Sequence, residues 1–554
     1  DLPIVSRLLE SLNLTVTSEL CLGSANYLCK RKFQQLQHRS RREMAGSTSG
    51  WMNDFRKWES RTKTGILSQY TGYVAPGFLQ NVARESDRCL GAKCPNYSVS
   101  HYFVAKERWQ KADLLIVNHA LLARHLLNDG NLLPDFDAVV IDEAHHFAEI
   151  FNAQAESTLS FQWLKSVIAE LSFDTTDLED SLAEFRTELA GRLQSQNSQL
   201  RLTQKIKSDQ LNSLIDLLHE AITTVNESSD DDLFADHSVE SDLQRKSLKG
   251  RLEEAAHLLD KLCDDPTKDE VFSLTSQPHD LSLTISPLDS MGKINELFLN
   301  TIDSIVFTSA TLTTNQSFDY FDRQTGIEQH EHTDRFKRLI FESPFDYRSN
   351  SLLYIPRNLP EPQGFDTSFD TACIDQIRKL IELSKGGVLV VFSSQRSMRI
   401  IEAGMTGIRY PIFSTTDGGP QRALHRFHET ENSVLFGLES FRQGLDIRGD
   451  KLRMVILVRL PFAPLTDPLF EARDQREKAS GRNSFMTLQL PTMIMKMRQG
   501  FGRLIRSSKD KGVVAILDPR IYSRPYGKTL LSSLPKARQT DSFDELQDWW
   551  LHRF

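Results

Sequence analysis

The chain has 554 residues, of which 39% are hydrophobic and 25% are charged, and its net charge is −8. This length allows several domains with separate cores, and no apolar run approaches the roughly 20 residues that a membrane-spanning helix needs. Six cysteines in so long a chain, with no secretory signal at its start, argue against a disulfide scaffold and indicate a reducing, cytoplasmic compartment.

The first segments combine a helix, a strand and a basic region. Residues 1–14 have the pattern of an amphipathic helix, and LTVTSELCL at 14–22 has that of a strand. Positive charge then gathers over residues 30–63, where Trp51 and Trp58 are available to stack on bases. This region is a candidate surface for a nucleic-acid backbone, and a solvated helical face explains the same pattern equally well.

Three cysteines in the first hundred residues are candidate ligands of a metal or cluster. Cys89 and Cys94 are joined by a short loop of the kind that directs two thiolates at one metal or cluster, and Cys29 is a further candidate ligand. Cys263 and Cys373 stand among apolar residues and are expected to be small core side chains.

Two apolar strands follow, at 112–122 and 138–141, and the second runs directly into Asp142 and Glu143. Adjacent carboxylates repel one another, so the pair is best tolerated where a cation or a proton-transfer task stabilises it. Ligands in open α/β sheets bind just beyond the carboxyl ends of the strands. The alternative is a solvated acidic turn after a strand.

The spacing of apolar residues in the rest of the chain predicts a helical insertion and a second α/β region. Residues 152–275 repeat apolar positions at helical spacing, which predicts an all-helical insertion. Strand patterns return in five places: 304–312, 386–394, 433–449, 452–462 and 512–520. The sequence therefore predicts an α/β protein with two doubly wound parallel-sheet domains, the first of which carries two insertions.

The last polar segment, QGFGRLIR at 499–506, places Arg503 and Arg506 three residues apart. On a helix this spacing directs both guanidiniums to one side, and arginine is the side chain best suited to clamp phosphate oxygens. Two solvated arginines on an amphipathic helix are the alternative.

Several short segments in this order resemble superfamily 2 helicases of the XPD-like, iron–sulfur group, most closely the bacterial DinG and YoaA helicases. The segments are GSANYLC at 23–29, RCLGAKCPNY at 88–97, VNHALL at 117–122, DEAH at 142–145, TSATL at 308–312, ESPFDY at 342–347, GLDIRG at 444–449, QGFGRLIR at 499–506 and RPYGKTLLSSLP at 524–535. The set spans essentially the whole chain. It implies two RecA-like helicase domains.

The resemblance implies a role in ATP hydrolysis for residues of both helicase domains. Asp142 would hold the Mg²⁺ that bridges the phosphates of ATP, and Glu143 would orient or deprotonate the attacking water. His145 would couple this site to the facing domain. The other residues implied for the nucleotide cleft are Gly444, Asp446, Gln499, Arg503 and Arg506, of which the two arginines would stabilise the transferred phosphoryl group. Those implied for coupling or DNA binding are Ser309, Thr311, Ser393 and Arg396.

The same resemblance implies a division of the chain. The expected segments are helicase domain 1 at 1–24, an iron–sulfur-type insertion at 25–108, helicase domain 1 again at 109–151, a helical arch at 152–278, the return of helicase domain 1 at 279–340 and helicase domain 2 at 341–554.

Two features depart from the family pattern. No phosphate-binding loop of the form G-x-x-x-x-G-K-S/T occurs, which we expect to reflect a missing N-terminal part, and the alternative is a relative that binds without hydrolysis. The fourth cluster cysteine would fall at Ser100. The 4Fe–4S cluster implied by Cys29, Cys89 and Cys94 is therefore either lost from a vestigial domain, or completed by His101 or an outside ligand.

The resemblance implies an ATP-dependent helicase that moves 5′ to 3′ on single-stranded DNA and acts on forked or R-loop DNA, without a membrane. The degenerate cluster positions are similar to those of DinG-like helicases of type IV CRISPR systems, which implies an RNA-guided effector complex as a partner, and a repair role is the alternative. A nucleic-acid-binding recruitment module is the rival function. A nuclease that uses Asp142 and Glu143 is weaker, because no further acids stand at strand ends with metal-ligand spacing.

Overall fold

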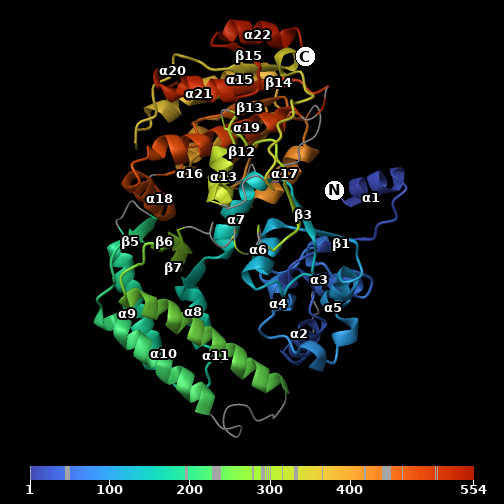
Figure 1. Ribbon diagram of the computed structural model, residues 1–554, viewed down its shortest axis with the longest axis vertical. Coiled ribbons are helices and arrows are strands. Elements are labelled where there is room, and N and C mark those ends of the chain that lie inside the picture. Colours follow the sequence, from blue (N-terminus) through green and yellow to red (C-terminus); the bar gives the residue numbers. More distant parts are fainter. Residues whose placement is uncertain are drawn as a thin grey trace. The chain divides into compact units, whose positions relative to one another are not determined.

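The computed structural model of the chain (Figure 1) falls into two units. It describes residues 2–43, 50–193, 198–227, 239–277, 280–288, 294, 296, 299, 301–314, 316–329, 335–364, 366–416, 419–438, 451–464, 466–505, 507 and 509–554. The first unit comprises residues 1–141, 146–307 and 466–469, and the second comprises residues 142–145, 308–465 and 470–554.

The second unit is built on a parallel sheet of seven strands in the order β11-β12-β10-β13-β14-β9-β15. In chain order these are β9 (Ser351–Tyr354), β10 (Val388–Phe392), β11 (Ile412–Ser414), β12 (Val434–Leu438), β13 (Met454–Leu457), β14 (Gly512–Ile516) and β15 (Arg538–Thr540). Every described pairing is parallel, so all the carboxyl ends lie at one edge. This sheet confirms the predicted doubly wound α/β fold for this part of the chain.

Helices cover both faces of this sheet, as the alternation of side chains along the strands requires. Val388 and Val390 of β10 face a core shared with α15 (Ser368–Ser384), α16 (Gln395–Ala403) and α22 (Phe543–Leu551). Leu389 and Val391 face the opposite core, shared with α17 (Pro420–Glu429), α19 (Leu490–Leu504) and α21 (Tyr526–Ser533). The remaining helices are α13 (Asp319–Thr325), α14 (Tyr347–Asn350), α18 (Pro468–Ala479) and α20 (Arg520–Ser523), with a π-helical turn at Phe485–Gln489 before α19.

The parallel strands of the first unit form two separate pairs. One pair is β1 (Ser18–Cys21) with β2 (Leu114–Val117), and the other is β3 (Ala138–Ile141) with β8 (Ser304–Phe307). The helices beside them in the chain are α1 (Leu2–Ser11), α6 (His119–Leu127) and α7 (Phe147–Gln154). Val140 and Val306 stand opposite each other and are both exposed, so one face of the second pair is uncovered in the described residues.

The cysteine-bearing region contains α2 (Lys30–Glu43), α3 (Gly50–Glu59), α4 (Phe78–Val82) and α5 (His101–Trp109). An aromatic core holds it together, in which Phe33, Phe55 and Phe78 meet edge to face. Trp51 and Trp58 pack against this core through Phe78 and Phe55. Both rings are therefore engaged in packing, which makes them poor platforms for stacking on bases.

The arch region contains four helices, α8 (Phe161–Ile168), α9 (Thr176–Arg192), α10 (Asp209–Glu227) and α11 (Val239–Asp260), of which α9 and α11 both lie against α10 (Figure 1). The prediction that this insertion is all helical is wrong. It also holds an antiparallel sheet in the order β4-β7-β6-β5, formed by β4 (Ser157–Ser160), β5 (Gln199–Leu202), β6 (Glu270–Gln277) and β7 (Asp280–Pro287). The last of these strands lies beyond the expected end of the arch at residue 278. The two long strands form a hairpin whose inner side chains join the helical core.

The described part of the chain contains no candidate for a membrane-spanning helix. None of its helices combines the length and the apolar character that a bilayer span demands.

Candidate nucleotide site and cysteine pocket

The candidate nucleotide site begins where β3 and β8 end. These strands pair in parallel with Ile141 opposite Phe307, so the segments that follow them emerge together. A backbone hydrogen bond of 3.0 Å from Ala144 to the carbonyl of Thr308 continues the pairing beyond the strands. Residues 142–145 and 308–313 are thereby held side by side, as expected for strand ends of a parallel sheet.

Glu143 stands at this point in an unusual backbone conformation. Its φ is +48°, in the left-handed region that costs a non-glycine residue about 1–3 kcal/mol and that occurs preferentially at functional sites. Its N–H donates to the Oδ1 of Asp142 at 3.0 Å. The turn leaves the Glu143 side chain 57% exposed, so its carboxylate is open to a ligand.

His145 is buried and is held from both ring nitrogens. Its Nδ1 lies 2.7 Å from the hydroxyl of Ser309, and its Nε2 contacts the side-chain amide of Gln499. With the Gln499 amide nitrogen as donor, Nε2 is the acceptor, so the neutral ring carries its proton on Nδ1.

Ser309 joins this histidine to the carboxylate. Its hydroxyl donates to Oε2 of Glu143 at 3.0 Å, while the N–H of Thr311 donates to it at 3.1 Å. The hydrogen bonds therefore run in one direction, from Gln499 through His145 and Ser309 to Glu143. We call these four side chains the relay. If Gln499 moves, the surroundings of Glu143 change through His145 and Ser309. The relay can therefore link movement of α19 to the carboxylate.

The structure brings together six of the predicted residues, places two on a different segment and does not describe the remaining four side chains or residues. Those that meet are Asp142, Glu143, His145, Ser309, Thr311 and Gln499. Ser393 and Arg396 are exposed on a different segment, after β10 and in the first turn of α16. Gly444, Asp446 and Arg506 lie outside the described residues, as does the side chain of Arg503 in the last turn of α19.

A second feature of the same unit escaped the sequence reasoning. A pocket of about 480 Å³ is lined by Phe462, Phe485 and Tyr526 together with Arg520 and Arg524. The three rings lie 5.2–5.8 Å apart between centroids, and the guanidinium of Arg520 lies 5.4 Å from the centre of the Phe462 ring.

The arginine in this pocket is held rigidly. Arg520 forms a bidentate ion pair with Asp518, which is fully buried and also accepts the N–H of Leu460. The only sequence signal was the polar end of the strand GVVAILDPR, where Asp518 and Arg520 follow β14. A fixed cation beside clustered rings can bind a flat, negatively charged ligand.

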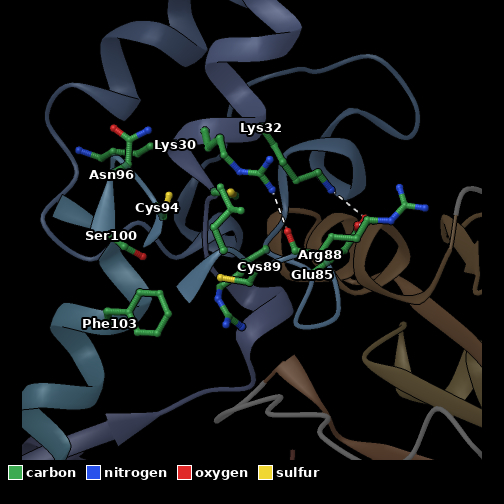
Figure 2. A pocket seen from close by; sticks show the side chains of 13 residues that line it. Lys30, Lys32, Glu85, Arg88, Cys89, Cys94, Asn96, Ser100 and Phe103 are labelled. Carbon is green, nitrogen blue, oxygen red and sulfur yellow. Dashed lines mark hydrogen bonds and ion pairs between the residues drawn. The ribbon is translucent and has the colours of Figure 1, made fainter. Parts of the chain in front are cut away.

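The three cysteines predicted as cluster ligands all belong to the first unit. Cys29, Cys89, Cys94 and Ser100 line one small pocket, together with cationic side chains that include Lys30, Lys32 and Arg88 (Figure 2). Its volume is about 30 Å³, and a single water needs about 10–15 Å³ of such space.

His101 does not line this pocket. Its ring packs against Gly65, where an added Cβ would lie 2.2 Å from it, and burial together with the charge of Lys30 lowers the pKa of the imidazole. The suggestion that His101 completes a cluster is therefore not supported.

The residues present do not fit a four-iron cluster. Three thiols and one hydroxyl replace four thiolates, and the pocket has room for about two waters. Among the described residues, no three His, Cys, Asp or Glu side chains are gathered as a metal ion would require.

Comparisons with known proteins show similarity over most of the chain. Residues 377–537 match the family described as helicase C-terminal domain. Over 98% of its length the chain is 29% identical to the ATP-dependent DNA helicase YoaA of Escherichia coli, covering 85% of that protein. Over 99% it is 26% identical to the 3′-5′ exonuclease DinG of Bacillus subtilis, covering 64% of that protein.

A solved structure described as XPD helicase superposes with a TM-score of 0.60 at 17% identity, covering 97% of this chain and 89% of the other. That likeness establishes the fold. Over nearly its whole length the chain is therefore similar to the helicases named YoaA and DinG, and its residues 377–537 match a helicase C-terminal domain.

Proposed function

We propose that the protein is an ATP-driven helicase that moves 5′ to 3′ along single-stranded DNA and unwinds duplexes. The relay carries this proposal, because it places a carboxylate at a strand end and ties it to a helix of the helicase C-terminal domain through His145 and Ser309. A relative named as an ATP-dependent DNA helicase supports the same function.

In this proposal each side chain has a task in the hydrolysis of ATP. Asp142 would hold the Mg²⁺ ion, which neutralises phosphate charge, and Glu143 would orient the attacking water or take its proton. Gly444 and Asp446 would line the nucleotide site, and Arg503 and Arg506 would stabilise charge on the transferred phosphoryl group. Thr311 would act with Ser309 to link hydrolysis to movement of the strand.

The aromatic pocket of the second unit supports binding of single-stranded DNA. Base stacking on aromatic rings does not depend on sequence, and arginines beside the rings suit the phosphate backbone. Each of the three rings has the other two as neighbours, so removal of Phe485 takes away one stacking surface and loosens the packing of Phe462 and Tyr526. Ser393 and Arg396 are further proposed contacts to the strand.

Replacing Phe485 by alanine is expected to weaken binding of labelled oligo-dT about tenfold, since stacking is worth about 1–3 kcal/mol per base. Because an uncharged ring neutralises no phosphate, the slope of log Kd against log salt should stay as in the wild type. Fluorescence anisotropy at several salt concentrations measures both quantities. Phe554→Ala, which removes an exposed ring that stacks on Trp550, is the matched control and should bind normally. Unchanged affinity in Phe485→Ala would rule out this pocket as part of the strand path.

The rival function is a nucleic-acid-binding module without hydrolysis, favoured by the absence of the phosphate-binding loop pattern in these 554 residues. Protein expressed from the complete gene discriminates the two. The helicase proposal expects ATP hydrolysis that single-stranded DNA stimulates, whereas the binding module binds DNA with no such hydrolysis.

We place the protein in the bacterial cytoplasm, acting on forked or R-loop DNA. An RNA-guided CRISPR effector complex is the proposed partner, and DNA repair is the other setting. Unwinding of R-loops made by such a complex, compared with unwinding of forks of equal length, separates the two roles.

We further propose that residues 25–108 fold without an iron–sulfur cluster. The aromatic core and a set of polar contacts take over the role of a cluster in holding the cysteine-bearing loop. Arg31 donates to the carbonyl of Arg88, Lys32 pairs with Glu85, and Asp87 accepts the hydroxyl of Ser247 on α11 (Figure 2 shows the first two).

Protein purified without oxygen is therefore expected to contain no stoichiometric iron or acid-labile sulfide, and a chelator should leave its Tm unchanged. Ser100→Cys restores the fourth thiol and should raise the iron content after anaerobic reconstitution. Ser98→Cys, which adds a thiol to the same turn but not to a residue that lines the pocket, serves as the control. Stoichiometric iron and sulfide in the wild type would contradict the proposal.

A further inference from the structure

Arg498, the residue before Gln499 on α19, is not one of the predicted site residues, yet it contacts the segment that follows β8. Its Nη1 donates to the carbonyl of Thr313 at 2.8 Å, and its Nη2 donates to the carbonyl of Ala310 at 3.2 Å. One guanidinium thus spans the turn that begins directly after Ser309.

This turn needs such support. Residues 308–313 lie beyond the end of β8 in turn and loop conformation, so no strand ladder fixes them among the described residues. The bond from Ala144 to Thr308 holds the near end of the segment, and Arg498 holds the far end. Ser309 lies between these two attachments.

The hydrogen bonds of Arg498 are of a kind that fixes the position of the main chain in the turn. Burial lowers the pKa of the Arg498 guanidinium, and a charge that is partly withdrawn from water must be hydrogen-bonded to be retained. Its acceptors are backbone carbonyls, which fix the path of the main chain whatever side chains the turn carries. The planar fork of arginine reaches both carbonyls at once, which the single ammonium of lysine does less well.

We propose that Arg498 is a positioning residue for the hydrolysis of ATP. Gln499 holds His145 while its neighbour Arg498 holds the turn that carries Ser309, so two successive residues of α19 set both ends of the Ser309–His145 hydrogen bond. Without Arg498 the turn is free to shift, and Glu143 loses the hydroxyl that joins it to His145. This inference rests on the proposed function.

The test uses protein from the complete gene and compares Arg498→Met with Arg453→Met. Arg453 also donates to a backbone carbonyl, that of Lys385, and it stands directly before β13, away in sequence from the turn that carries Ser309. Arg498→Met is expected to lower kcat for ATP about 10–100-fold, as small displacements of catalytic groups do, with little change in KM. Arg453→Met should lower Tm to a similar degree and leave kcat as in the wild type.

A double-mutant cycle with Ser309→Ala measures whether the two substitutions affect kcat independently. A role of Arg498 in stability alone would give independent effects. If Arg498 acts through Ser309, the effects of the two substitutions on kcat are not additive. Arg498→Lys keeps the charge but offers its donors from a single nitrogen, so its kcat should fall between those of the wild type and Arg498→Met. It covers the case in which the methionine variant does not fold.

Three results would overturn the inference. They are wild-type kcat in Arg498→Met, additive effects in the cycle, or an equal loss of kcat in Arg453→Met. If the wild type itself hydrolyses no ATP, the proposed function fails first and this inference fails with it.

Discussion

Glu143→Gln is expected to lower the DNA-stimulated turnover of ATP by about 10²–10⁴-fold, the range that a general base contributes. The amide is nearly the same size as the carboxylate and still accepts the hydroxyl of Ser309, so the relay should keep its geometry. It cannot take a proton from water. Phosphate release with saturating oligo-dT measures the loss.

Binding of single-stranded DNA should be nearly unchanged in this variant, because the Glu143 carboxylate lies at the proposed nucleotide site and does not line the aromatic pocket. Glu149→Gln, an exposed residue of the first turn of α7, is the matched control and should hydrolyse ATP normally. Wild-type turnover in Glu143→Gln would exclude the role proposed for this residue.

Arg506→Ala is expected to lower kcat by about 10³-fold or more, as the loss of arginines that stabilise phosphoryl transfer does elsewhere. KM for ATP should change far less, since the guanidinium acts on charge that develops in the transition state. Arg506→Lys should recover little, because an ammonium does not reproduce the planar bidentate contact. Single-turnover hydrolysis measures the chemical step directly.

Arg538→Ala, an exposed arginine at the start of β15, is the control for loss of one positive charge. It should retain wild-type kcat. If Arg506→Ala folds, binds ATP and turns over at the wild-type rate, the phosphate clamp was assigned to the wrong residue.

The meeting of the two strand ends was the most predictable part of the candidate site, because the carboxyl ends of neighbouring parallel strands lie together whatever stands between them in sequence. Glu143 and Ser309 are 166 positions apart, yet both directly follow apolar strands and meet at 3.0 Å. The sequence did not reveal that the Ser309 hydroxyl is the central link. Hydrogen-bond partners of a side chain depend on rotamers and turns that no spacing encodes.

The sheet of the arch was missed for a related reason. β4 and β5 are four residues each, and nothing local distinguishes such short runs from the loops between helices. The hairpin at 270–287 was the available signal, since the alternation in EVFSLTSQ and DLSLTISP has the period of a strand. The periodic helices around it dominated the interpretation.

Trp51 and Trp58 show that residue types alone do not identify a nucleic-acid surface. Tryptophan among basic residues is typical of nucleic-acid surfaces, but the same rings also suit the core of a small insertion that has little else to bury. The structure packs them against Phe78 and Phe55. In contrast, the aromatic pocket around Phe485 has no local signature, because its rings come from segments more than 20 residues apart in sequence.

Asp142 and Arg506 are expected to contact one and the same nucleotide. A crystal structure of protein from the complete gene with Mn²⁺ and a non-hydrolysable ATP analogue, with the metal located by anomalous scattering, tests this directly. We expect the metal to be bound by the Asp142 carboxylate and by phosphate oxygens of the analogue, with the guanidinium of Arg506 on the terminal phosphate. A metal bound elsewhere, or an analogue that contacts only one of these two residues, would contradict it.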